Sequence, residues 1–252
     1  MIDGYSMNSD NLSQVSQDEL RRTLSQGEIT SALLMPQGSN HTFLVTVSDG
    51  SHECQAVYKP RSGERPLWDF PSGTLYKREY ASYLVTQSLS WDFIPCTVIR
   101  EGPYGIGTVQ QFIDVNPKSN YFTLREECPE EIERIALFDC FSNNADRKAS
   151  HCFSDRVGRV WSIDHGLTFH PEPKLRTVIW DFEEKPIQSH LLEQIDALLS
   201  NLRSSGGLVQ ELQLLLASVE LDALCRRLER LLRTGRFPSQ DPNRRNVPWP
   251  WF

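Results

Sequence analysis

Four polar residues in the middle of the chain have the types and the order that phosphoryl-transfer chemistry uses. Asp146 lies in the polar stretch "SNNADRKASH" (142–151), and Asp164 ends the apolar run "WSID". Two carboxylates on neighbouring loops can bind Mg²⁺ and position a nucleophile. Asn144 and His151 would supply neutral ligands or hydrogen bonds. Taken alone, an Asn-Asp-Arg loop is more often an ordinary turn held by side-chain hydrogen bonds, so the surrounding elements must decide.

A lysine and a glutamate in the first half of the chain form a second candidate group. Lys59 ends the apolar pattern "AVYKP", and Glu79 lies between Tyr76 and Tyr83 on the apolar face of a predicted helix. An inward carboxylate needs a partner, because an unpaired buried charge is costly. Kinase folds use such a Lys–Glu pair to hold the lysine on ATP phosphates. The alternatives are a solvated Lys59, and a Glu79 that is solvated or paired within its own helix.

The elements that must position these residues follow from hydrophobic periodicity and from turn residues. We predict strands over 28–36, 41–48 and 52–60, and hairpins over 96–114 and 151–166. Helices are predicted over 16–27, 74–90 and 129–144, with three more between about 187 and 235. Because strands crowd the first half and helices the second, the sequence predicts an α+β chain of two lobes.

The predicted lobes have explicit bounds. Residues 1–15 are expected to be disordered, 16–114 to form a β-rich lobe with one key helix, and 115–252 to form a mostly helical lobe. The loop 61–73 carries Arg65 and Trp68, and is either a structural lid or a segment that closes over a ligand. The last helices carry leucine stripes, which favour packing within the chain over a dimer zipper.

Composition excludes several classes of protein. The chain has 252 residues and a formal net charge of −7, so the whole molecule shows no signature of nucleic-acid binding or of a basic membrane surface. It has no apolar run of membrane-spanning length and no signal peptide at its polar N-terminus, which predicts a cytoplasmic protein. Its six cysteines form no CxxC pair and sit beside apolar neighbours, which predicts buried free thiols in a reducing compartment. The oligomeric state is left open.

The turn before the second strand could hold a phosphate. It contains Gly38, Ser39 and Asn40 in "PQGSNHTFLV". A turn of this kind between strands presents backbone N–H groups, which can cradle phosphate oxygens. Since one glycine is a weak signal, an ordinary turn is the simpler interpretation.

The combined order of these features resembles the kinase fold. A turn, a strand lysine, an inward glutamate, a hairpin, a helix, "NNADRKASH" and then "SIDHG" follow one another. This order is similar to that of phosphatidylinositol 3- and 4-kinases and HipA-type protein kinases. The segments "YKPRSGERPLWDFPSGTLYKREYASYLV" and "IDHGLTFHPEPKLRTVIW" also resemble small bacterial phosphatidylinositol-kinase-like proteins. The resemblance covers roughly residues 30 to 205, and its motifs are specific only when taken together.

The resemblance implies ATP and Mg²⁺ as cofactors and a role for each site residue. Lys59 would contact the α and β phosphates, and Glu79 would orient it. Asp146 would accept the proton of the substrate hydroxyl or orient that hydroxyl, Arg147 would brace the loop, and Asp164 would bind Mg²⁺. The hinge that reads adenine through backbone groups would be Gln110, Gln111, Phe112 and Ile113.

One position departs from the family pattern. His151 stands where the family has its second metal ligand, an asparagine. Because Mg²⁺ prefers oxygen, this histidine could favour Mn²⁺, bind phosphate directly, or mark a single-metal site with weak catalysis. Asn144 is a candidate partial substitute. Near the cleft, Lys174 and Arg176 could meet an anionic substrate or be solvated.

These features lead to one functional hypothesis with two alternatives. The leading one is an ATP-dependent phosphotransferase acting on a hydroxyl of a protein, a lipid or a small molecule. The first alternative is a non-catalytic nucleotide-binding pseudokinase, which His151 would favour. The second is a kinase-fold enzyme that transfers AMP.

Overall fold

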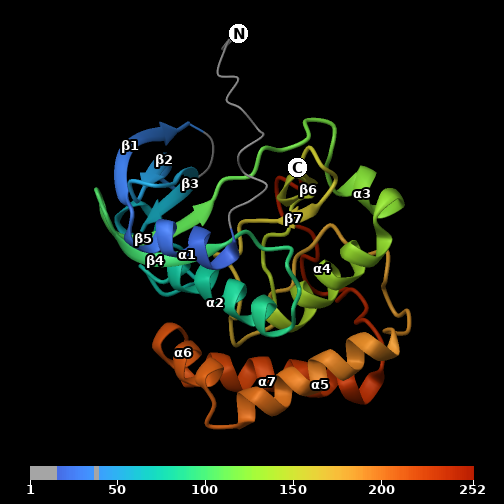
Figure 1. The fold of residues 1–252 in the computed structure, drawn as a ribbon. Helices are drawn as coiled ribbons and strands as arrows, with labels where there is room; N and C mark the ends of the chain where they lie inside the picture. The colour runs from blue at the N-terminus through green and yellow to red at the C-terminus, as the bar shows by residue number, and fades with distance from the viewer. Residues whose placement is uncertain (1–15, 37–39) are drawn as a thin grey trace.

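The computed structural model describes residues 16–36 and 40–252, so the predicted disordered N-terminus lies outside the described residues. Figure 1 shows a twisted sheet on one side of the molecule and helices on the other side and below. The sheet has five antiparallel strands in the order β1-β2-β3-β5-β4. The strands are β1 (Glu28–Met35), β2 (Thr42–Ser48), β3 (Glu53–Pro60), β4 (Thr97–Gly102) and β5 (Gly105–Gln111).

Two helices accompany this sheet. They are α1 (Gln17–Gln26) and α2 (Leu75–Ser88). Ser16 caps α1 through a capping box with Glu19, which confirms the predicted start of that helix. The α+β arrangement predicted from the sequence, with strands first and helices second, is confirmed.

The second half of the chain is mainly helical. Its helices are α3 (Tyr121–Glu127), α4 (Pro129–Ser142), α5 (Ser189–Arg203), α6 (Gly207–Leu215) and α7 (Ser218–Thr234), and a small hairpin joins β6 (Cys152–Ser154) to β7 (Val160–Ser162). The predicted boundary between residues 114 and 115 falls in the connection from β5 to α3, and stays a prediction.

Helix α3 was not predicted. Its start is set by Asn120, whose side chain accepts a hydrogen bond from the Phe122 N–H, while the Thr123 hydroxyl accepts one from the Asn120 N–H. This polar capping pattern is the signal that the sequence offered. Tyr121 and Leu124 are buried and fix the helix against the core.

The alternation of side chains along β3 determines where Lys59 points. Ala56 and Tyr58 are fully buried, so Lys59 leaves the strand on the opposite face from Tyr58. On α2, Glu79 is buried between Tyr76 and Tyr83, as predicted. The strand lysine and the helix carboxylate are therefore brought to one face of the sheet.

The leucine stripes of the last helices pack within the chain. Leu198, Leu202, Leu224 and Leu228 are buried in the main core, which supports the packing interpretation. The six cysteines are all free, but only Cys96 and Cys152 are buried; the prediction of burial is wrong for the other four, which are partly exposed. Over the described ranges, no helix is long and apolar enough to cross a membrane.

Candidate active site

Three charged side chains, one each from β3, from α2 and from the turn after β7, meet in one group. The Lys59 Nζ lies 3.2 Å from Oε1 of Glu79 and 3.3 Å from Oδ1 of Asp164. Burial alone would lower the pKa of Lys59, but the two carboxylates outweigh it and raise that pKa. Lys59 lowers the pKa of Asp164 in return. The lysine is thus a fixed cation, and Asp164 is an ionised carboxylate.

The two carboxylates differ in their access to solvent. The Glu79 side chain is 2% exposed, whereas that of Asp164 is 49% exposed. Glu79 therefore has no room for a ligand and can act only on the lysine. Asp164 has a free side and can exchange partners, which a metal-binding or phosphate-facing carboxylate requires.

The backbone at Asp164 is strained. Its φ is +63°, in the left-handed region that non-glycine residues seldom occupy. The preceding residue, Ile163, donates its N–H to the His151 carbonyl at 3.0 Å, which holds the turn in place. Strain of this kind concentrates at functional sites, because the surrounding structure must impose it.

His151 faces the same carboxylate. Its Nε2 lies 3.4 Å from Oδ2 of Asp164, while its Nδ1 faces the Lys148 N–H at 3.5 Å. Burial lowers the pKa of His151 to about 4, so the imidazole is neutral at pH 7. With Nδ1 turned towards an N–H, we assign the proton to Nε2, which makes His151 a donor to Asp164 rather than a ready metal ligand.

The loop after α4 is held by a fully buried ion pair. Arg147 Nε lies 2.9 Å from Oδ2 of Asp139, and Nη2 lies 2.9 Å from Oδ1. Arg147 also donates to the Ile163 carbonyl at 3.1 Å and contacts His165 Nε2 at 2.9 Å. Both charged side chains are completely buried. This geometry is that of a brace between the two acid-bearing loops.

Asn144 belongs to the hydrogen-bonded group of Arg147 and Asp139, and not to the group of Lys59, Glu79 and Asp164. Its Oδ1 accepts the Asp146 N–H at 3.1 Å, and its Nδ2 donates to Asp139 at 2.8 Å. The residue is fully buried. The structure therefore does not bring Asn144 to Asp164 and His151, with which it was predicted to bind metal.

Asp146 is paired with Lys148, a residue that was not predicted to belong to the site. The Lys148 Nζ lies 3.0 Å from Oδ2 of Asp146. Burial raises the pKa of Asp146, and Lys148 opposes that shift. Alternate residues of an extended segment point to the same side, so with Arg147 turned inwards Asp146 and Lys148 both face outwards. That alternation in "DRK" was the available signal.

The predicted hinge is used largely inside the sheet. Gln110 is buried and donates its Nε2 to Thr97 at 2.8 Å. The N–H groups of Gln111 and Phe112 donate to the carbonyls of Cys96 and Gln55. Ile113 packs against Phe153 and Trp161. Two of the predicted N–H groups are therefore already occupied.

The predicted phosphate turn is described only in part. Gly38 and Ser39 lie outside the described residues. Asn40 accepts the Arg65 N–H through Oδ1 at 2.9 Å, which ties this turn to the loop 61–73.

The loop 61–73 is also tied to the second half of the chain. Asp69 forms an ion pair with Lys174 at 2.9 Å, and both side chains are largely buried. Trp68 is 91% exposed and lies against the Lys174 ammonium at 5.2 Å. Lys174, predicted either to meet a substrate or to be solvated, instead anchors this loop.

The donor set for a metal is small. In residues 16–36 and 40–252, no group of three or more His, Cys, Asp or Glu side chains is arranged to hold an ion. One partly exposed carboxylate still fits Mg²⁺ or Mn²⁺, because such ions in nucleotide sites take most of their ligands from phosphates and water. Asp164 meets this requirement and His151, as a donor to it, does not add a ligand.

Comparisons with known proteins place this geometry in context. No model of a known protein family matches the chain. The chain is similar in structure to the Golgi casein kinase with Mn/ADP bound, with a TM-score of 0.61 and 15% identity over 90% of this chain and 80% of that one. It also resembles hydra Fam20 with sugar, with a TM-score of 0.54 and 16% identity over 89% of each chain. At such identities the likeness shows the fold, and the predicted kinase-like fold is confirmed.

One relative is close in sequence along nearly its whole length. Protein Rv2133c of Mycobacterium tuberculosis is 36% identical over 276 aligned positions, which include 96% of this chain and 98% of that protein. The chain belongs to the family of Protein Rv2133c.

Proposed function

We propose that this protein is an ATP-dependent phosphotransferase that carries the γ-phosphoryl group to a hydroxyl. The observation that supports the proposal is the placement of Lys59 between Glu79 and Asp164, facing the loop of Asp146. A fixed cation beside an exchangeable carboxylate is what a nucleotide's phosphates and their metal need. The structural neighbour named with Mn/ADP bound has the same fold.

The chain's own residues then have distinct tasks. Lys59 neutralises the non-transferred phosphates, and Glu79 keeps its ammonium in position. Asp164 would hold a divalent ion, which when bound supplies charge neutralisation on the phosphate oxygens. The acceptor oxygen forms its bond to the γ-phosphorus as the bond to the bridging oxygen breaks and ADP leaves. The proton of the acceptor hydroxyl passes to the Asp146 carboxylate.

The pKa of Asp146 suits this task. Burial raises it above the ordinary aspartate range, against the pull of Lys148. A carboxylate with a raised pKa is a better proton acceptor than an exposed one. Lys148, at 3.0 Å from Asp146, keeps that carboxylate oriented.

A non-catalytic nucleotide binder is the second candidate. Asp146 is already paired with Lys148, and His151 is a donor to Asp164 rather than a second metal ligand. Both features would weaken catalysis without preventing nucleotide binding. The pairing of Asp146 and of His151 does not indicate which class of acceptor is used. This includes the inositol lipid that the resemblance to phosphatidylinositol kinases suggests.

The first test is calorimetric titration of ATP with Mg²⁺, with Mn²⁺ and without metal. We expect metal-dependent binding to the wild type that is lost in Asp164→Ala and in Lys59→Ala. Arg233→Ala, at an exposed position in the last turn of α7, is the control and should bind as the wild type does. No binding to the wild type with any ion would refute both candidates.

The second test follows the label. Wild type incubated with γ-labelled ATP and cell extract should transfer label, and Asp146→Asn should lose transfer while still binding ATP. Transfer of label from α-labelled ATP would instead show AMP transfer. ATP binding with no transfer under either ion would favour the non-catalytic candidate.

A further inference from the structure

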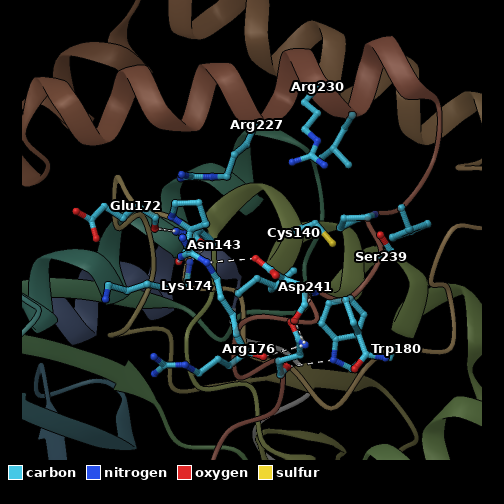
Figure 2. Close-up of a pocket in the computed structure, with 18 of the residues that line it drawn as sticks. Cys140, Asn143, Glu172, Lys174, Arg176, Trp180, Arg227, Arg230, Ser239 and Asp241 are labelled. Carbon is cyan, nitrogen blue, oxygen red and sulfur yellow. Dashed lines mark hydrogen bonds and ion pairs between the residues drawn. The ribbon is translucent and has the colours of Figure 1, made fainter.

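A pocket lies mainly in the helical half of the molecule, and Lys59, Glu79, Asp146 and Asp164 are not among its lining residues. It has a volume of about 1250 Å³ and lies between the segment 171–176, helix α7 and the chain after it (Figure 2). Figure 2 shows Arg227 and Arg230 extending from α7 on the side of the pocket opposite Asn143, at the end of α4, and Glu172, in the segment after β7. This volume far exceeds that of a single inorganic phosphate and leaves room for a larger ligand.

The charge of this pocket is opposite to that of the molecule. Eight lysine and arginine side chains and three acidic side chains line it, in a protein whose formal net charge is −7. A concave site lined by one sign of charge focuses its field and attracts counter-ions of the other sign. The composition argument against basic surfaces holds for the whole chain but not for this pocket.

Four of the arginines that line the pocket lack carboxylate partners. Arg176, Arg226, Arg227 and Arg230 form no ion pair with any described residue, whereas Lys174 and Arg244 do, with Asp69 and Asp241. Arg226 and Arg230 are exposed, on successive turns of α7. Their spacing of four residues places both guanidinium groups on one face of the helix.

Arg227 supplies the strongest observation. Its Nε donates to the Phe141 carbonyl at 2.6 Å and its Nη1 to the His170 carbonyl at 3.2 Å. Its Nη2 is buried and has no hydrogen-bond partner among the described residues. Burial lowers the pKa of Arg227 to about 10, as expected for a cation without a counter-ion. A buried guanidinium nitrogen without a hydrogen-bond partner is costly unless an anion accepts from it.

We propose that this pocket binds a soluble anion that carries several phosphate groups, with Arg227 at its base and Arg176, Arg226 and Arg230 around it. Guanidinium groups match phosphate oxygens through paired hydrogen bonds, which favours phosphate over a simple carboxylate. The site is separate from the proposed nucleotide site and does not depend on its activity.

The test is calorimetric titration of inorganic phosphate, tripolyphosphate and inositol hexakisphosphate into the full chain at physiological salt without added metal. We expect affinity to rise in that order. Arg226→Gln combined with Arg230→Gln should weaken binding of inositol hexakisphosphate by about 10-fold or more, since each lost charge-assisted hydrogen bond has an effect of that order. Both positions are exposed, so the fold should be retained, and thermal unfolding checks this.

Two controls separate this site from others. Arg134→Gln combined with Arg233→Gln removes the same charge outside the pocket and should leave affinity within about 2-fold, the small effect expected of distant screened charges. Lys59→Ala, which removes the lysine of the proposed nucleotide site, should bind inositol hexakisphosphate as the wild type does. Equal weakening in both arginine doubles, or loss of binding in Lys59→Ala, would overturn the proposal. So would binding only to phosphoinositide-containing vesicles and to no soluble probe.

Discussion

The charges around Arg147 and those around Lys59 form two groups that differ in how completely they are paired. Arg147 and Asp139 are both fully buried, and Asn144 and Thr177 also donate to the Asp139 carboxylate. In the second group, Lys59 is shared by Glu79 and Asp164, and about half of the Asp164 side chain is exposed to solvent.

This difference distinguishes a carboxylate that stabilises the loop, Asp139, from the two carboxylates proposed to react, Asp146 and Asp164. The oxygens of Asp139 have their hydrogen bonds from protein donors, so that carboxylate can only hold the loop in place. The side chains of Asp164 and Asp146 are both partly exposed, and each is paired with a lysine that a metal ion or a hydroxyl donor could replace. Complete pairing thus identifies the brace, and incomplete pairing identifies the residues that can bind a ligand.

Removing the brace should have the largest effect. Asp139→Ala leaves Arg147 buried and uncompensated, and we expect the free energy of unfolding to fall by about 3 to 5 kcal/mol. Denaturant unfolding measures this directly. Asp164→Ala, in the open group, should change stability far less. Equal losses in the two variants would erase the distinction between the groups.

Low pH should destabilise the protein because His151 is neutral in the folded state. The pKa of His151 is about 4 in the fold against an ordinary 6.5, so the unfolded chain binds more protons between these values. Stability should therefore fall as the pH drops from 6.5 to 4, by ~3 kcal/mol from this residue. His165, whose pKa burial also lowers, acts in the same direction.

The measurement is the unfolding midpoint against pH. His151→Gln should flatten the dependence in that window, while leaving the part that His165 causes. His190→Gln, at an exposed position, is the control and should keep the wild-type profile. A His151→Gln profile that overlays the wild type would show that this imidazole is not held neutral by burial.

Loss of the buried glutamate should weaken nucleotide binding moderately. In Glu79→Gln the lysine keeps only Asp164 as a charged partner, and we expect ATP affinity to fall about 10-fold, or ~1.4 kcal/mol. Combined with Lys59→Met, the change should add little beyond Lys59→Met alone, because Glu79 acts through the lysine. Calorimetry on the four proteins of this cycle gives the coupling, and full additivity would contradict it.

An exposed ion pair should have the smallest effect. Arg156 and Asp114 are paired at 2.5 Å, but their side chains are 64% and 67% exposed. Arg156→Gln should leave the unfolding midpoint unchanged within error, because solvent and salt screen such pairs. A clear loss of stability would show that burial does not govern which pairs matter here.

Local patterns predicted much of the fold and part of the site. The alternation in β2 and β3 and the capping box of α1 predicted those elements. The position of Glu79 between two tyrosines predicted its pairing with Lys59, because an inward charge on an apolar face demands a partner. The same argument applies to Asp139 in "IALFDCF", an acid on a buried helix face, and would have found the partner of Arg147.

The remainder depends on contacts between distant segments. Nothing local to Arg227 shows that its Nη2 lacks a partner, since its neighbours there belong to α4 and the segment after β7. The role of Asn144 is hidden for the same reason, because only the fold shows that both ends of its amide are used. The arginine pocket likewise joins residues that are 50 or more positions apart, such as Arg176 and Arg226.

The last residues of the described chain form hydrogen bonds with the loop after α4 and with the segment after β7. The Trp251 carbonyl accepts the Ala149 N–H at 2.9 Å, and the Asn246 carbonyl accepts the Thr177 N–H at 3.0 Å. During biosynthesis the Ala149 N–H therefore cannot form this bond until Trp251, about 100 residues later, has been made. At ordinary translation rates the synthesis of the intervening residues takes roughly 5 to 20 seconds. The loop that carries Asp146 is therefore completed only after residue 251 has been made.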